Sequence, residues 1–190
     1  MNWRRSLIGL GISVPMIALL AYGMTQDPNA IPSPLPGKEA PVFDLPVISG
    51  DTGRINLADL RGNVVVVNFW ASWCLQCRYE HADLSAAAVA YKDSNVRFYG
   101  VLWRDTPKNG LDWIEMMGGQ SYPSLHDDRK GTGIDYGVYG APETFIIDQN
   151  GVVAHKFIGA VTLMELREQI DPLLANVESE SVVSEIERGS

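Results

Sequence analysis

The chain has 190 residues, 46% of them hydrophobic and 20% charged, which suits one globular domain with extensions. Its formal net charge of −8 argues against a nucleic-acid partner, because binding to phosphates requires basic patches. Its two cysteines are too few and too close together for a secreted domain held together by several disulfides.

The N-terminal segment has the pattern of a membrane anchor. Arg4 and Arg5 precede an uncharged stretch of roughly 18 residues, the lower limit for a helix that spans a bilayer. Because the basic residues come first, we expect a cytoplasmic N-terminus, with the rest of the chain on the far side, the periplasm in a bacterium. A cleaved signal peptide is the alternative, but no clean small-residue cleavage site is present. We therefore favour an uncleaved transmembrane anchor over residues 1–24.

The following segment, residues 25–41, is predicted to be an extended linker because it is rich in proline. Its prolines are Pro28, Pro32, Pro34, Pro36 and Pro41. The globular domain is predicted over residues 42–175. Residues 176–190 contain four glutamates, one arginine and few large apolar side chains, so we expect a disordered acidic tail.

Within the domain, apolar periodicity and turn residues predict alternating strands and helices. They comprise a hairpin within 43–56, a helical turn over 56–62, a buried strand over 64–70, a helix over 74–92, a second buried strand over 96–103, a helix over 107–118, a polar loop over 126–136, strands over 143–148 and 151–158, and a last helix over 162–174. Asn150-Gly151 is a strong hairpin turn, and Thr162 with Glu165 predicts a capping box.

The two cysteines lie where the first buried strand gives way to a helix. Cys74 and Cys77 are separated by two residues, the arrangement of a redox-active dithiol. At a helix start, unpaired N–H groups and the helix dipole favour negative charge, so we expect Cys74 to be the nucleophile. Cys77, one turn further, is the expected resolving thiol. We expect no cofactor beyond the disulfide between Cys74 and Cys77.

Other interpretations of these residues are weaker. Cys74, Cys77 and His81 have a spacing that zinc sites use, but a structural zinc needs a fourth ligand, and the two other histidines show no partner pattern. A haem attachment motif would need histidine at the position of Arg78. We therefore expect no metal site, and a protein that is not itself a cytochrome.

The order of elements, with a dithiol after the first central strand, describes an α/β thioredoxin-like fold, a central mixed sheet flanked by helices. The chain resembles the membrane-anchored thioredoxin-like proteins of cytochrome c maturation, the CcmG/DsbE family, from about residue 37 to residue 174. Three motifs carry the resemblance: N-F-W-A-S-W-C over 68–74, C-R-Y-E-H over 77–81 and G-V-Y-G-A-P-E-T-F-I-I-D over 137–148. The third is the most discriminating, because W-C-x-x-C occurs throughout the superfamily.

The resemblance also implies roles for residues outside the dithiol. It implies a cis peptide bond between Ala141 and Pro142 that exposes the Ala141 backbone for pairing with a substrate chain. Cytosolic thioredoxins carry a buried aspartate where this chain has Asn68, and an asparagine cannot take up a proton at neutral pH. Glu80 and Glu143 are therefore the candidates for acid–base help, although each could instead be a surface carboxylate.

Two residues beside Cys74 complete the predicted site. We expect Trp73 to cover the disulfide and limit its exposure to solvent, and Trp70 to pack in the core. Leu75 stands where the family usually has proline, and this departure leaves the reduction potential open.

The implied function is that of a disulfide reductase anchored by a single span in the inner membrane, with its domain in the periplasm. It would take electrons from a membrane thiol transporter and reduce the C-x-x-C-H disulfide of apocytochrome c, directly or through another maturation factor. Two alternatives stay open: a general oxidant or isomerase of secreted proteins, and a thioredoxin-fold module that binds an apoprotein without turnover.

Overall fold

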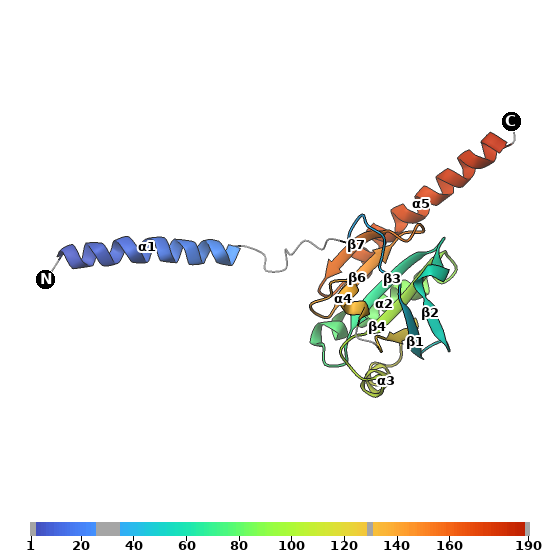
Figure 1. Ribbon diagram of the computed structural model, residues 1–190, viewed down its shortest axis with the longest axis horizontal. Coiled ribbons are helices and arrows are strands. Elements are labelled where there is room, and N and C mark those ends of the chain that lie inside the picture. Colours follow the sequence, from blue (N-terminus) through green and yellow to red (C-terminus); the bar gives the residue numbers. More distant parts are fainter. Residues whose placement is uncertain (1–2, 26–34, 129–130, 189–190) are drawn as a thin grey trace. The chain divides into compact units, whose positions relative to one another are not determined.

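The computed structural model describes residues 3–25, 35–128 and 131–188, and the chain divides into two compact units, Met1–Pro32 and Ser33–Ser190 (Figure 1). In the first unit, α1 (Trp3–Thr25) occupies the segment for which we expected an anchor. Among the residues that are described, no helix combines the length and the apolar character that crossing a membrane requires.

Most of the predicted linker, residues 26–34, lies outside the described residues. The rest of the linker is attached to the domain. The Gly37 N–H donates to the Val153 carbonyl at 2.8 Å, and the Ala40 N–H donates to the Gly151 carbonyl at 2.9 Å. Backbone pairing therefore brings residues 37–40 into the domain that we expected to begin at residue 42.

The domain is built on a seven-stranded mixed sheet with the strand order β2-β1-β5-β4-β3-β6-β7. Its elements are β1 (Asp44–Ser49), β2 (Arg54–Asn56), the 3₁₀ turn η1 (Leu57–Leu60), β3 (Val64–Trp70), α2 (Leu75–Ala90), β4 (Val96–Leu102), α3 (Pro107–Met116), β5 (Ser124–His126), α4 (Thr132–Asp135), β6 (Glu143–Ile147), β7 (Val153–Ile158) and α5 (Leu163–Arg188). β3 is parallel to β4 and antiparallel to β6. This confirms the predicted thioredoxin-like architecture.

The central strand β3 is buried along its whole length. Its odd-numbered residues belong to one core cluster, in which the Phe69 ring centroid lies 5.3 Å from that of Tyr136 and 5.7 Å from that of Phe145. Its even-numbered valines pack on the opposite face with apolar residues of α2 and α5. Because both faces are covered, the strand is apolar nearly throughout, and its C-terminal end is held rigidly at the point where the cysteines follow.

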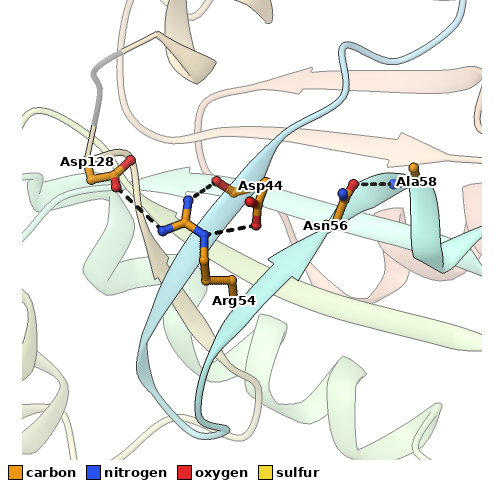
Figure 2. A network of polar contacts seen from close by, with 5 residues as sticks. All are labelled: Asp44, Arg54, Asn56, Ala58 and Asp128. Carbon is orange, nitrogen blue, oxygen red and sulfur yellow. Dashed lines mark hydrogen bonds and ion pairs between the residues drawn. The ribbon is translucent and has the colours of Figure 1, made fainter.

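The N-terminal hairpin and the helical turn after it are confirmed. Figure 2 shows Arg54 of β2 joined to Asp44 of β1 and to Asp128, which follows β5. Arg54 Nε lies 3.0 Å from Asp44 Oδ1, and Arg54 Nη1 lies 3.7 Å from Asp128 Oδ2. The Asn56 side chain accepts the Ala58 N–H at 3.0 Å and so caps η1.

The prediction of a continuous polar loop over residues 126–136 was wrong. The region includes the end of β5, which pairs with β1 and β4, and the short helix α4. The Asp127 carboxylate accepts the N–H groups of Gly131, Thr132 and Gly133 at 3.1–3.2 Å and so begins this helix. A strand of three residues and a helix of four are too short to show a period in the sequence.

The last helix is longer than predicted. The capping box is confirmed, because the Thr162 N–H donates to Glu165 Oε2 at 2.8 Å and the Glu165 N–H donates to Thr162 Oγ1 at 3.3 Å. However, α5 continues to Arg188, through most of the segment for which we expected a disordered tail. The reason lies in the sequence, since neither glycine nor proline interrupts it between Ala175 and Gly189.

Candidate active site

The dithiol lies at the junction of β3 and α2, as predicted. Cys74 is the N-cap of α2, with an extended backbone (φ −83°, ψ 113°), and its Sγ accepts the Cys77 N–H at 3.1 Å. The two cysteines form a disulfide, and only 5% of Cys74 and 2% of Cys77 are exposed. Helix N–H groups and the helix dipole favour a thiolate at this end, which suits Cys74 to attack a substrate disulfide.

Hydrogen bonds to Asp105, which follows β4, hold the loop that carries Cys74. Asp105 Oδ2 accepts the Ser72 N–H at 2.8 Å and the Ser72 hydroxyl at 2.5 Å. Burial raises the pKa of Asp105, but hydrogen bonds from Ser72, Asn109 and Thr106 outweigh it, so the pKa is lowered. Asp105 is therefore a stable anion that holds the residues before Cys74.

Two buried tryptophans pack with the cysteines, whereas the neighbouring Trp73 is more than half exposed. Trp70 and Trp113 belong to the same buried cluster as the cysteines, with their ring centroids 4.8 Å apart. Trp73 is 58% exposed, and its indole N–H donates to the Arg104 carbonyl at 3.4 Å. Trp70 and Trp113 thus pack on the buried side of the dithiol, and the cover by Trp73 stays a prediction.

Behind the dithiol, Asn68 and Glu80 form a buried polar pair. The Asn68 amide donates to Glu80 Oε1 at 2.8 Å and to Thr144 Oγ1 at 3.0 Å. Glu80 Oε2 accepts the Val161 N–H at 3.0 Å, so both carboxyl oxygens are held by neutral donors. Only 2% of Glu80 is exposed. The carboxyl group is therefore fixed in the protein interior and is not a surface group of α2.

The pKa of Glu80 lies in the range in which a carboxyl group can take part in thiol–disulfide exchange. Desolvation by burial raises the pKa of Glu80 to about 7, against the lowering effect of the hydrogen bonds from Asn68 and Val161. Glu80 lies one helical turn after Cys77, and both residues line the same small cavity together with Trp113. A carboxyl group poised near neutral pH beside the resolving thiol can accept and return its proton.

The peptide bond between Ala141 and Pro142 is cis, as the resemblance implied. Ala141 is half-buried and packs against the cluster that contains both cysteines. The Pro142 carbonyl accepts the Gly159 N–H at 2.9 Å, which fixes the loop on its far side. Ala141 therefore lies against the cluster that contains the disulfide, where a substrate strand could pair with its backbone.

Glu143 is buried, but its surroundings differ from those of Glu80. Its Oε1 accepts the N–H groups of Tyr139 and Gly140 at 3.1 and 3.3 Å. Its Oε2 lies 2.7 Å from Lys156 Nζ, and the two side chains are 1% and 4% exposed. Glu143 is thus joined to the loop and to a buried cation and is suited to holding the loop, whereas Glu80, held by neutral donors, is suited to carrying protons.

Sequence reasoning missed the roles of five residues of this site: Asp105, Trp113, Thr144, Lys156 and Val161. All of them are distant in the sequence from the cysteines, so only the tertiary packing reveals the contacts. Lys156 gave a signal that could have been used. A lysine between the apolar ends of a hairpin strand, opposite Phe145, suggests a buried partner.

No group of three or more histidine, cysteine, aspartate or glutamate side chains suited to a metal ion occurs in the part of the chain that the structure describes. His81, the third member of the zinc-like spacing, instead packs edge-on against Trp113, and its Nε2 lies 2.7 Å from the Gly119 carbonyl oxygen. His81 is therefore part of the support for α3.

Comparisons with known proteins find relatives along most of the chain. The AhpC/TSA family model matches residues 36–156. The chain is 43% identical to the thiol:disulfide interchange protein DsbE of Allochromatium vinosum, over 90% of this chain and 93% of that one. It is 38% identical to DsbE of Pseudomonas aeruginosa (88% and 91% covered) and 39% identical to the thiol:disulfide interchange protein HelX of Rhodobacter capsulatus (81% and 86% covered).

The chain is also similar to solved structures of thiol–disulfide oxidoreductases. A crystal structure of a thiol:disulfide interchange protein DsbE from Chlorobium tepidum superposes with a TM-score of 0.66 and 30% identity, covering 73% of this chain and 97% of that one. A secreted thiol-disulfide isomerase from Corynebacterium glutamicum superposes with a TM-score of 0.63 and 26% identity, covering 72% and 85%.

Proposed function

We propose a specific task for this chain, which belongs to the DsbE/HelX family of thiol:disulfide interchange proteins and is therefore a thiol–disulfide oxidoreductase. The task is to reduce the disulfide of the C-x-x-C-H motif in apocytochrome c, directly or through another maturation factor, so that both thiols can accept haem. The resemblance of residues 137–148 to the proteins of cytochrome c maturation supports this substrate class. A membrane thiol transporter would return the electrons.

The observation that carries a reducing role is the buried Glu80. A strongly oxidising dithiol has a stabilised thiolate in its reduced form. Here a carboxyl group with a pKa of about 7 lines the same cavity as Cys77. Once ionised, it places negative charge close to the sulfur atoms, which disfavours a thiolate and so favours the disulfide form of the protein. A dithiol that prefers to be oxidised is a reductant.

This arrangement supports the following reaction. The Cys74 thiolate attacks one sulfur of the substrate disulfide, forming a mixed disulfide and releasing the first substrate thiolate, which takes a proton from water. Glu80 accepts the Cys77 proton, and the Cys77 sulfur attacks Cys74. The second substrate thiolate leaves and is protonated. Two electrons have passed from the dithiol to the substrate, and the protein carries the disulfide between Cys74 and Cys77.

Trapping tests this assignment. Replacing Cys77 with alanine removes the resolving thiol, so the mixed disulfide at Cys74 is expected to accumulate, and mass spectrometry should find apocytochrome c or a maturation factor attached. The matched control is the Cys74→Ala, Cys77→Ala double variant, which should attach to nothing. A set of trapped proteins without haem-binding motifs or maturation factors would contradict the proposed substrate.

A redox titration separates reductant from oxidant. Equilibration of the isolated protein with glutathione should give a reduction potential closer to that of thioredoxin, about −270 mV, than to that of DsbA, about −120 mV. A value at the oxidising end would instead support the general oxidant that the sequence left open.

The proposal includes a location. Arg4 and Arg5, followed by an uncharged stretch, support an N-terminal segment that directs the domain across the inner membrane and holds it there by a single span. A fusion of alkaline phosphatase after the last residue is expected to be active, because the enzyme folds only outside the cytoplasm, and to sediment with membranes. Changing both arginines to glutamate should reduce this activity. An inactive fusion to the unaltered chain would contradict the proposed orientation.

A further inference from the structure

We propose that Lys156 is a positioning residue for substrate binding, acting through Glu143 on the backbone beside Ala141. This inference rests on the proposed function only in that the substrate is a polypeptide disulfide. Lys156 lies on β7, directly opposite Phe145 of β6 in the hairpin register. It touches neither cysteine in the contacts described above, so any effect on the reaction must pass through the groups that it holds.

The ammonium group of Lys156 is enclosed by the loop that precedes β6. Its Nζ lies 2.7 Å from Glu143 Oε2 and 3.4 Å from the Gly137 carbonyl oxygen. It also lies 5.0 Å from the Phe145 ring centroid and 5.4 Å from that of Tyr139. A lysine side chain with 4% exposure is stable only with a charged partner, and Glu143 is that partner.

The carboxylate passes this constraint to the substrate-binding backbone. Glu143 Oε1 accepts the N–H groups of Tyr139 and Gly140, the two residues immediately before Ala141. On the other side, the Pro142 carbonyl accepts the Gly159 N–H. Ala141 is thus held between two fixed neighbours and packs against the cluster that contains the disulfide.

Loss of the Lys156 charge would leave a buried carboxylate without its cation. Without its ion pair the carboxylate would no longer be held in place, and its hydrogen bonds to the loop would weaken. The dithiol chemistry would be unaffected, because Glu80 is held by other groups. The KM should therefore change only for a substrate that pairs with the loop backbone.

The test compares two kinds of substrate in the full-length protein. For Lys156→Met, we expect the KM for a peptide disulfide to rise about tenfold, because one or two backbone hydrogen bonds to the substrate are lost. The kcat should change less than the KM. The rate with bis(2-hydroxyethyl) disulfide, which has no peptide backbone, should stay unchanged. Lys156→Arg should restore the peptide KM. Lys108→Met, at an exposed ion pair with Asp112, is the matched control and should change neither rate.

A second variant and a second peptide substrate complete the test. If Lys156→Met fails to fold by circular dichroism, the Glu143→Gln, Lys156→Met double variant carries a neutral pair, and its peptide KM should exceed that of the unaltered chain while its small-disulfide rate does not change. Equal losses with both substrates, or no change with either, would overturn the inference. Each assay uses a C-x-x-C-H peptide and an unrelated peptide. If the unaltered protein reduces the unrelated peptide but not the C-x-x-C-H peptide, the proposed function is contradicted. The KM for the unrelated peptide then still tests the role of Lys156.

Discussion

Replacing Glu80 with glutamine is expected to slow the closure of the disulfide between Cys74 and Cys77 by about 10²-fold, the usual contribution of a positioned general base. The same change should remove the inflection near pH 7 from the rate of this step, because the carboxyl group whose pKa burial raises to about 7 is gone. The measurement is rapid mixing of the reduced protein with a peptide disulfide, followed by acid quenching and mass spectrometry of the mixed disulfide.

The control for this experiment is Glu115→Gln, which removes a carboxylate from the exposed face of α3. It should leave both the rate and its pH dependence as they are. An inflection near pH 7 that persists in Glu80→Gln would show that another group accepts the Cys77 proton. Attack by Cys74 on the substrate should change much less than closure, so accumulation of the mixed disulfide in Glu80→Gln is the expected signature.

The second large effect concerns stability. The pKa of Glu80 is raised from 4.5 to about 7 by burial, so between these values the folded state binds a proton that the unfolded state has lost. The free energy of unfolding therefore falls as the pH rises through this window, and it is highest below about pH 4.5 as far as this group is concerned. The contribution of Glu80 to the free energy of unfolding changes by roughly 3 kcal/mol across this window, at about 1.4 kcal/mol for each pKa unit.

Denaturant unfolding of the oxidised protein at several pH values between 4.5 and 8 measures this effect. The comparison with Glu80→Gln isolates it, because other groups titrate in both proteins. His155 is one of them, since burial lowers its pKa and its contribution has the opposite sign. The wild-type protein should lose stability relative to the variant as the pH rises. Parallel curves for the two proteins would mean that Glu80 is not desolvated in solution.

Much of the fold could be predicted because its signals are local. The run of valines in β3 is apolar enough to require cover on both faces, and the turn at Asn150-Gly151 joins β6 to β7 as expected. The short elements β5 and α4 were missed because three or four residues have no period. The true end of α5 was missed because acidic composition alone does not stop a helix.

The site was predicted to the extent that its residues neighbour one another in the chain. Cys74, Cys77 and Glu80 follow from the strand-to-helix junction and helical spacing, and the cis bond before Pro142 follows from the resemblance. The different environments of Glu80 and Glu143 could not be read from the sequence. One carboxyl group is buried among neutral donors, whereas the other is paired with Lys156.

The sequence by itself determined that this protein carries a redox-active dithiol at the start of a helix, because two cysteines at that spacing after a buried strand need no distant partner to be recognised. Only the tertiary structure decided how the dithiol is surrounded. It brought Trp113 of α3 into the buried cluster of the cysteines, and it desolvated Glu80 between β3 and the segment before α5. Burial and charge pairing depend on which elements pack together, and these packing contacts set the pKa values on which the chemistry depends.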